Sequence, residues 1–330
     1  MDLDVFAAVH RTQWDRLNEL ARLRRLSGEQ ADELLRLYRT ASTHLSMIRS
    51  VSPESALSAS LSTLLARART RFTGARSNFA QDAAHFFVLA LPSAFYRLRW
   101  LSLAVGAVFV VIAVLYGTWA AGNPLVLGAL GGDERLRQLV DHDFVDYYSA
   151  NPGASFAGQV WTNNSWLAAQ AVALGVTGVY VPFMVYQNAM GVGLTGGVMF
   201  GYGRGDVFFS YILPHGLMEL TAVFVACAAG LRIFWAWVSP GPQPRLVSLA
   251  NEGRSLITVA IGLLIVLFVS GLVEAFVTPS PLPVWVKIGI GSVVLASYWA
   301  YTLILGRPAW QAGERGDLDT IDAGDTLATT

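Results

Sequence analysis

The chain has 330 residues, of which 54% are hydrophobic and 14% charged, and its formal net charge is +0. Soluble domains carry about 25% charged residues and lack apolar runs long enough to cross a bilayer. Such runs recur here from Trp100 onward, so composition excludes an ordinary soluble protein and predicts an all-α, polytopic membrane protein. The single cysteine, Cys227, lies inside an apolar run, which excludes an internal disulfide and a cysteine metal site.

Residues 1–99 are polar and lack a long apolar run, so they predict a helical head outside the membrane, and the distribution of arginines near the span ends predicts that it is cytoplasmic. Apolar residues recur at helical spacing over residues 1–26, which predicts a first helix. Ser27 with Gln30 forms a capping-box pattern that opens a second helix.

Two more helices are predicted in the head. Ser52 followed by Pro53 indicates an N-cap and a first-turn proline, which start a third helix that runs towards Gly74. A fourth helix, over residues 78–98, ends in a belt of aromatic and arginine side chains that is typical of a membrane surface: Tyr96, Arg97, Arg99 and Trp100. We expect this helix to lie along the interface before the chain turns into the bilayer.

The apolar segments predict a transmembrane bundle of about six helices over residues 100–306. The spans are expected at 100–120, 165–185, 188–203, 211–238, 256–277 and 284–305. The acidic segment 121–163 is predicted to be an extracytoplasmic loop. Residues 165–203 are too long for one span, so we place a turn near Tyr186–Asn188, although one span with a re-entrant segment also fits. The polar tail 307–330 is predicted to be disordered and cytoplasmic.

An even number of spans places both termini on one side of the membrane. Arginines gather at the span ends on that side: Arg97, Arg99, Arg232, Arg245, Arg254 and Arg307. Because positively charged residues accumulate in cytoplasmic loops, both termini are expected in the cytoplasm.

One polar motif interrupts the apolar spans, Pro-His-Gly-Leu-Met-Glu at residues 214–219. His215 and Glu219 are four residues apart and therefore share one helix face. In the six-span topology they lie at the depth of polar residues from two other segments: Asn163, Asn164 and Glu274. Ionisable residues inside a membrane are costly and usually face a bundle interior or a water-filled cavity. We therefore predict one polar cluster that opens outward.

Three roles fit this polar cluster. It can be a hydrogen-bonded brace between helices, since polar side chains join helices within membranes. It can handle a proton or a polar substrate, because intramembrane carboxylates mark transport pathways. A catalytic metal site is the third role, but His215 is the only histidine in a predicted span and the two-histidine zincin spacing is absent. We expect no metal and no cofactor.

Glycines recur every four residues at Gly193, Gly197, Gly201 and Gly205. Glycine at this spacing gives a smooth face on which another helix backbone can approach closely. We expect this face to pack within one subunit, although a homodimer would use the same contact. A suitable partner face carries small residues on the following span: Ala222, Ala226 and Gly230.

Over nearly the whole chain the sequence resembles the stage II sporulation protein M family, also catalogued as DUF95. The most specific match is the Pro-His-Gly-x-x-Glu motif at 214–219 within a span. Further matching positions are Asp4, Phe6, Trp14, Leu37-Tyr38-Arg39, Pro92, Arg97, Asn163-Asn164, Asn188, Gly191 and Glu274-Ala275-Phe276.

The resemblance implies an integral protein of the bacterial cytoplasmic membrane and brings no catalytic residue. In spore formers the namesake scaffolds a peptidoglycan-degrading complex with a lytic transglycosylase and an amidase. Relatives in other bacteria are often encoded near MoxR-type AAA+ ATPases and DUF58 proteins. We expect a non-enzymatic scaffold for cell-envelope or peptidoglycan remodelling, with a transporter or channel and an intramembrane hydrolase as alternatives. Nucleic acid is not an expected partner, because the head has no reading motif.

Overall fold

The computed structural model describes residues 3–23, 26–52, 55–72, 79–148 and 153–316. Within these residues the protein is all-helical, as the sequence predicts. The chain forms two compact units, Met1–Asp82 and Ala83–Thr330.

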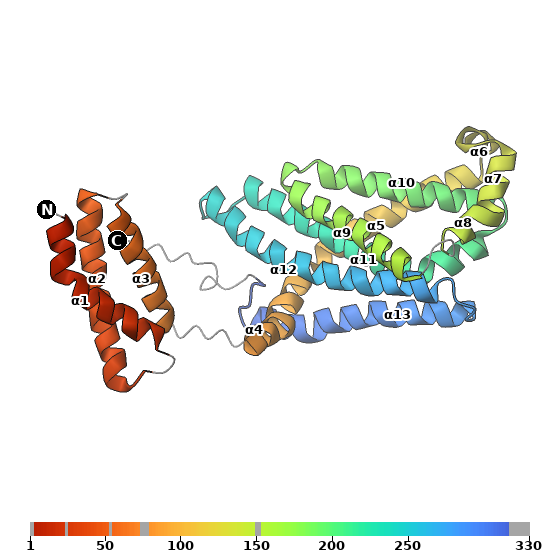
Figure 1. The fold of residues 1–330 in the computed structure, drawn as a ribbon. Helices are drawn as coiled ribbons and strands as arrows, with labels where there is room; N and C mark the ends of the chain where they lie inside the picture. The colour runs from red at the N-terminus through yellow and green to blue at the C-terminus, as the bar shows by residue number, and fades with distance from the viewer. Residues whose placement is uncertain (1–2, 24–25, 53–54, 73–78, 149–152, 317–330) are drawn as a thin grey trace. The chain divides into compact units, whose positions relative to one another are not determined.

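The first unit is a bundle of three helices, α1 (Leu3–Arg22), α2 (Gly28–Val51) and α3 (Ala56–Phe72), seen in Figure 1. Its core consists of side chains that are nearly or fully buried: Trp14, Leu17, Leu20, Leu34, Ile48 and Leu61. The capping box of Ser27 and Gln30 at the start of α2 is confirmed. The predicted start of the third helix at Pro53 lies outside the described residues.

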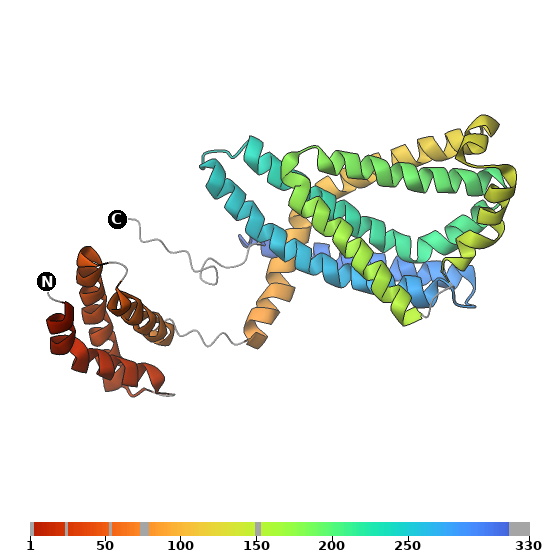
Figure 2. The ribbon, with the colours of Figure 1, turned by 45° about the horizontal axis from the view of Figure 1, so that its top comes forward.

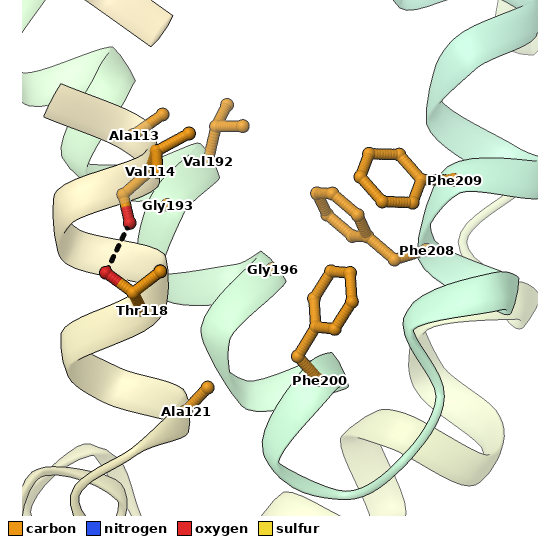
Figure 3. Close-up of a pocket in the computed structure, with 11 residues that line it drawn as sticks. Ala113, Val114, Thr118, Ala121, Val192, Gly193, Gly196, Phe200, Phe208 and Phe209 are labelled. Atoms are coloured by element: carbon orange, nitrogen blue, oxygen red, sulfur yellow. Dashed lines mark hydrogen bonds between the residues drawn. The ribbon is translucent and has the colours of Figure 1, made fainter. Parts of the chain in front are cut away.

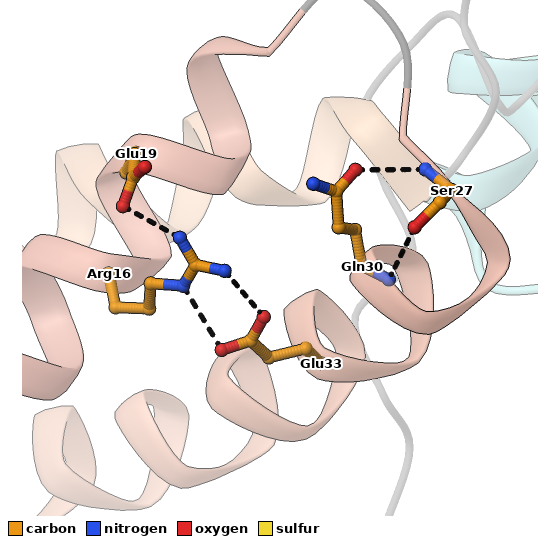
Figure 4. A network of polar contacts seen from close by, with 5 residues as sticks. All are labelled: Arg16, Glu19, Ser27, Gln30 and Glu33. Atoms are coloured by element: carbon orange, nitrogen blue, oxygen red, sulfur yellow. Dashed lines mark hydrogen bonds and ion pairs between the residues drawn. The ribbon is translucent and has the colours of Figure 1, made fainter.

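Polar contacts join the helices of this unit. Two guanidinium nitrogens of Arg16 on α1 donate to the two carboxylate oxygens of Glu33 on α2, at 3.1 Å and 2.9 Å (Figure 4). The bond from Arg16 lowers the pKa of Glu33. Deeper in the unit, the Trp14 indole donates to Nδ1 of the buried His44 at 3.2 Å. Burial lowers the pKa of His44, because a charged imidazole loses its hydration there.

The second unit is a bundle of long helices around a central one (Figures 1 and 2). The helices are α5 (Leu91–Ala121), α9 (Gly153–Leu174), α10 (Tyr180–Gly201), α11 (Gly205–Val238), α12 (Arg245–Leu272) and α13 (Val284–Ala300). Helix α11 contacts each of the other five. Its fully buried small residues, Ala222, Ala226, Cys227, Ala228 and Ala229, let those neighbours approach closely.

Among the residues that the structure describes, four helical stretches are long and apolar enough to cross a membrane: Asp82–Ala121, Gly205–Val238, Arg245–Val277 and Val284–Gln311. The protein is therefore a multi-pass membrane protein. The two shorter helices α9 and α10 occupy the region of the second and third predicted spans, and they are not among these four.

The connection between α9 and α10 differs from the prediction. The predicted turn at Tyr186–Asn188 lies inside α10, and the chain reverses instead at η3 (Gly175–Thr177) and Gly178. Gly178 has a φ of 73°, a left-handed conformation that ends a helix readily only when the residue lacks a Cβ. Apolar length alone did not locate this glycine turn.

The stretch before residue 100 also differs from the prediction. Helix α4 (Phe79–His85), the π-helical turn η1 (Phe86–Ala90) and α5 follow one another without a break, so the predicted turn into the bilayer near residue 99 is absent. The physical reason is that Phe95 and Leu98 are buried in the core of the bundle, which holds this stretch in the same helix as the span.

The predicted acidic loop is largely helical. It contains α6 (Pro124–Leu130), α7 (Asp133–Gln138), the π-helical turn η2 (Leu139–Asp143) and α8 (Phe144–Asp146). These short helices bury a small core of their own together with α11: Leu136, Val140, Phe144 and Phe208.

The start of the predicted tail is folded as well. Helix α14 (Gly306–Gln311) lies against α5, where a Cβ on Gly306 would lie 2.2 Å from the Pro92 carbonyl oxygen. The Ser93 hydroxyl donates to the Glu314 carbonyl oxygen at 2.8 Å. The structure thus differs from the predicted disordered tail over residues 307–316, and residues 317–330 lie outside the described part of the chain.

An ion-pair network that the sequence analysis did not anticipate joins three helices of the bundle. The Glu252 carboxylate on α12 accepts from Arg97 on α5 and, at 3.0 Å, from Arg232 on α11. The Glu252 and Arg97 side chains are 15% and 12% exposed, whereas that of Arg232 is 40% exposed.

Candidate polar site in the bundle

His215, Glu219 and Glu274 converge where α11 meets the end of α12. One ligand-type atom from each of the three lies within 4.8 Å of the others. His215 and Glu274 are buried, with exposures of 5% and 4%. The structure thus brings Glu274 to His215 and Glu219, from which it is separated by 59 and 55 residues in the sequence.

The position of His215 follows from the local sequence of α11. Pro214 has no N–H, so the helix lacks one hydrogen bond immediately before His215. The Ser270 hydroxyl of α12 donates to the His215 carbonyl oxygen at 3.1 Å. On the other side, Gly291 of α13 lies so close that a Cβ there would be 2.1 Å from the Pro214 carbonyl oxygen. The backbone at His215 is therefore held from two neighbouring helices.

Glu274 lies in a π-helical turn, η4 (Val273–Val277), at the end of α12. The Thr278 N–H donates to the Val273 carbonyl oxygen at 3.0 Å, which closes this wider turn. Such turns occur as short insertions in α-helices, frequently at functional sites. Here the turn allows both Glu274 and Thr278 to reach His215.

The contacts of Thr278 are compatible with a His215 tautomer that carries its proton on Nδ1. The Thr278 hydroxyl lies 3.4 Å from the Val273 carbonyl oxygen, to which it donates, and 3.2 Å from His215 Nδ1. With its proton given to Val273, the hydroxyl oxygen accepts from Nδ1–H of the neutral imidazole. His215 Nε2 then presents a lone pair, and it faces Glu274 Oε2 at 4.0 Å.

Glu219 completes the cluster from one turn further along α11. Its side chain contacts Glu274 and, on α9, Asn164. The other predicted asparagine, Asn163, is exposed on α9, whereas Asn164 is the asparagine that contacts Glu219. Oε2 of Glu219 is shielded from solvent and has no hydrogen-bond partner among the described residues.

Three further residues at this site were missed in the sequence analysis. Tyr148, from the region predicted as a loop, is buried with its ring 5.7 Å from the His215 ring, and burial raises the pKa of its hydroxyl. Lys287 is buried on α13 and donates to the Thr278 carbonyl oxygen at 2.7 Å. The presence of a lysine within an apolar helix could have identified Lys287 from the sequence. Nothing in the sequence singled out Thr278.

His215 and Glu274 are buried, whereas Glu219 is partly exposed although its Oε2 is shielded from solvent, so the outward opening stays a prediction. The main pockets among the described residues are lined by other side chains. One of them, of about 410 Å³, lies between α5, α10 and α11 and is almost wholly apolar, with Phe200, Phe208 and Phe209 facing it (Figure 3). Chemically, the His and Glu side chains of the cluster can brace the helices, share a proton or hold a cation.

The glycine series packs against a different helix from the one expected. A Cβ on Gly193 would lie 2.4 Å from the Ala113 carbonyl oxygen, and one on Gly197 would lie 2.7 Å from the Gly117 carbonyl oxygen, both on α5. Gly201 faces Leu127, and Gly205 faces Phe200 of its own hairpin. The small-residue face of α11 contacts α9 instead, since a Cβ on Gly230 would lie 2.2 Å from the Ala171 carbonyl oxygen.

Comparison with known proteins gives a family for the membrane part. Residues 102–279 match the family described as stage II sporulation protein M, and residues 4–74 match a domain of unknown function, DUF8413. No curated protein and no solved structure matches the chain. The matched segment covers more than half of the sequence and includes all three residues of the polar cluster. The chain belongs to the stage II sporulation protein M family.

Proposed function

We propose that the protein is a non-enzymatic membrane scaffold that organises a cell-envelope or peptidoglycan-remodelling complex. Family membership supports this proposal, because the namesake of the family scaffolds such a complex in spore formers. The observation that carries it is the inward direction of the polar side chains. His215 and Glu274 are buried, Glu219 contacts Glu274 and Asn164 of α9, and the Tyr148 ring packs near the His215 ring.

An enclosed cluster fits a scaffold better than a conduit. A transport pathway requires polar side chains that line a cavity, and ligand sites commonly have volumes of about 300–1,000 Å³. The main pockets of the bundle are apolar and are lined by other residues. The polar contacts instead join α9, α11 and α12, which favours a brace that keeps the bundle rigid.

The two-unit organisation also fits a scaffold. The unit Met1–Asp82 has its own buried core, and the bundle presents exposed apolar side chains on α5 for lipid or partner helices: Val108, Val110, Val111, Val114 and Leu115. We place both termini in the cytoplasm of a bacterial cell, on the distribution of arginines near the span ends. Peptidoglycan-remodelling enzymes on the outside, and MoxR-type ATPases or DUF58 proteins on the inside, are the proposed partners.

Affinity purification of the intact, tagged chain from cross-linked native membranes tests this function. We expect envelope-remodelling proteins to co-purify with the wild type. The same proteins should co-purify with Glu219→Gln, as long as that variant keeps its thermal unfolding midpoint, because the cluster is internal. Asn163→Ala, an exposed change next to the cluster, is the matched control. Recovery of the intact chain without any envelope protein would contradict the scaffold.

A proton or ion pathway is a second candidate, and the unpartnered Glu219 Oε2 favours it. A pathway predicts that purified protein in liposomes carries a proton or cation flux, and that Glu219→Gln abolishes the flux without unfolding the protein. Liposomes without flux, prepared from protein that still binds its partners, would leave the scaffold as the function.

A further inference from the structure

We propose that His215, Glu219 and Glu274 bind a divalent metal ion of the Zn²⁺ type inside the bundle. This inference rests on the geometry of the cluster and not on the scaffold function. Each residue contributes one donor atom, and the three atoms lie within 4.8 Å of one another. In zinc sites the ligand atoms lie about 2.0–2.2 Å from the metal, so two ligands of one ion are separated by at most about 4.2 Å. Small side-chain rotations would bring the three donors within that range.

The charges of the cluster favour a cation at its centre. Two carboxyl groups, Glu219 and Glu274, contact each other in an enclosed site. Within the described residues, neither forms an ion pair with an arginine or a lysine, and Lys287 donates to the Thr278 carbonyl oxygen instead. Buried charges occur in proteins when they are paired or coordinate metals. A divalent ion balances both carboxylates and displaces the proton that the pair would otherwise share.

The imidazole is oriented for metal binding. In the tautomer that donates Nδ1–H to Thr278, His215 presents the Nε2 lone pair to Glu274 Oε2, 4.0 Å away. That separation is too long for a hydrogen bond, and in a neutral imidazole both facing atoms carry lone pairs. Histidine ligands of metals almost always donate their second ring N–H to an oxygen acceptor, and Thr278 supplies that acceptor here.

The unpartnered atom of Glu219 is an independent observation in favour of a ligand. Oε2 of Glu219 is shielded from solvent and has no hydrogen-bond partner among the described residues. Buried carboxylate oxygens are normally satisfied, so an orphan oxygen on a residue of this cluster indicates an absent positively charged partner. A donor set of one imidazole and two carboxylates suits Zn²⁺ and similar transition metals better than Mg²⁺ or Ca²⁺, which prefer oxygen ligands alone.

Metal analysis of the intact chain, purified in detergent through a tag that does not bind metal, tests the site. The protein is stripped with a chelator and titrated with ZnCl₂, and with MgCl₂ for comparison, while thermal unfolding is followed. We expect one Zn²⁺ per chain, and a decrease of about 100-fold in the unfolding equilibrium constant when free Zn²⁺ is about 100 times its Kd. Release of protons on Zn²⁺ addition to weakly buffered protein is the second readout.

Variants separate this site from adventitious binding. His215→Ala and the near-isosteric Glu274→Gln should lose the bound Zn²⁺ and the proton release. His142→Ala, which removes an exposed histidine flanked by Asp141 and Asp143, should keep both. Thr278→Val should weaken Zn²⁺ binding by about 10–100-fold, since it removes only the acceptor of Nδ1–H.

Three results would overturn the proposal. Wild-type protein that neither contains metal nor responds to chelator and Zn²⁺ would show that the carboxyl pair is neutralised by a proton. Retention of Zn²⁺ by His215→Ala, with loss in His142→Ala, would place the ion at the surface. Binding of Mg²⁺ in preference to Zn²⁺ would exclude the imidazole as a ligand. The wild-type titration does not depend on any variant folding.

Discussion

Replacement of Gly291 by alanine should loosen the contact that holds the backbone before His215. Gly291 on α13 faces Pro214 on α11, and an added Cβ would lie 2.1 Å from the Pro214 carbonyl oxygen. Real Cβ atoms do not approach other atoms within 3.0 Å, and the obstructing atom belongs to the backbone. The two helices must therefore separate by about 1 Å, since rotation of a side chain cannot relieve the clash.

The expected cost of Gly291→Ala is about 1–3 kcal/mol, the range measured when extra methylene groups are forced into packed interiors. Against it stands a gain of at most about 1 kcal/mol from the higher helix propensity of alanine. Gly289→Ala on the same helix is the matched control, because nothing lies within 4 Å of a Cβ there. That control should be neutral or slightly stabilising.

Thermal unfolding of both variants in the same detergent, at one scan rate, measures the difference. A change of 1 kcal/mol shifts the midpoint of a domain of this size by about 2–4 °C. Gly291→Ala should therefore unfold several degrees below Gly289→Ala. Equal midpoints for the two variants would show that α13 and α11 do not meet at Pro214, and would refute the packing on which the site geometry depends.

Two further predictions concern charged groups. Glu252→Gln should destabilise the bundle by about 1–3 kcal/mol in thermal unfolding, because Arg97 and Arg232 lose their shared charged acceptor. The control Arg137→Gln, which breaks an exposed ion pair, should leave the unfolding midpoint unchanged. Equal shifts of the midpoint in the two variants would contradict this reasoning. The second concerns His44, whose pKa is lowered by burial, so the unfolded chain binds that proton more readily. The head should keep its full stability above about pH 6.5, the ordinary histidine value, and lose it as the pH falls through the lower folded value. Hydrogen-exchange protection factors of residues 3–72, which are corrected for the intrinsic pH dependence of exchange, measure this loss of stability. The loss should be smaller in His44→Gln. Protection factors that do not change with pH would count against the effect.

Patterns with a single physical cause could be predicted from the sequence. Helical spacing and the Ser27 capping box gave the helices of the head, and long apolar runs gave four membrane-crossing stretches. The convergence of His215, Glu219 and Glu274 followed from the cost of charge within a bilayer. These predictions needed only local periodicity or a strong solvation penalty.

Features that depend on tertiary contacts could not be predicted in the same way. Asn163 and Asn164 are adjacent in sequence, but the rotation of α9 directs only Asn164 towards Glu219. The turn before α10 depends on Gly178, which is one of many glycines in the chain. The partner of Gly193 is α5 and not α11, because helix order within a bundle is not encoded in the spacing of small residues. Thr278 reaches His215 only through the π-helical turn around Glu274.

The most direct measurement of whether the polar cluster is closed is cysteine accessibility in membranes. In a Cys227→Ala background, which removes the only native cysteine, Glu274→Cys places a single thiol in the cluster and Asp141→Cys places one at an exposed position. A water-soluble maleimide applied to open membrane fragments should label residue 141 and leave residue 274 unlabelled until the protein is unfolded. Rapid labelling of residue 274 in the folded protein would show that water reaches the cluster, and would contradict an enclosed brace.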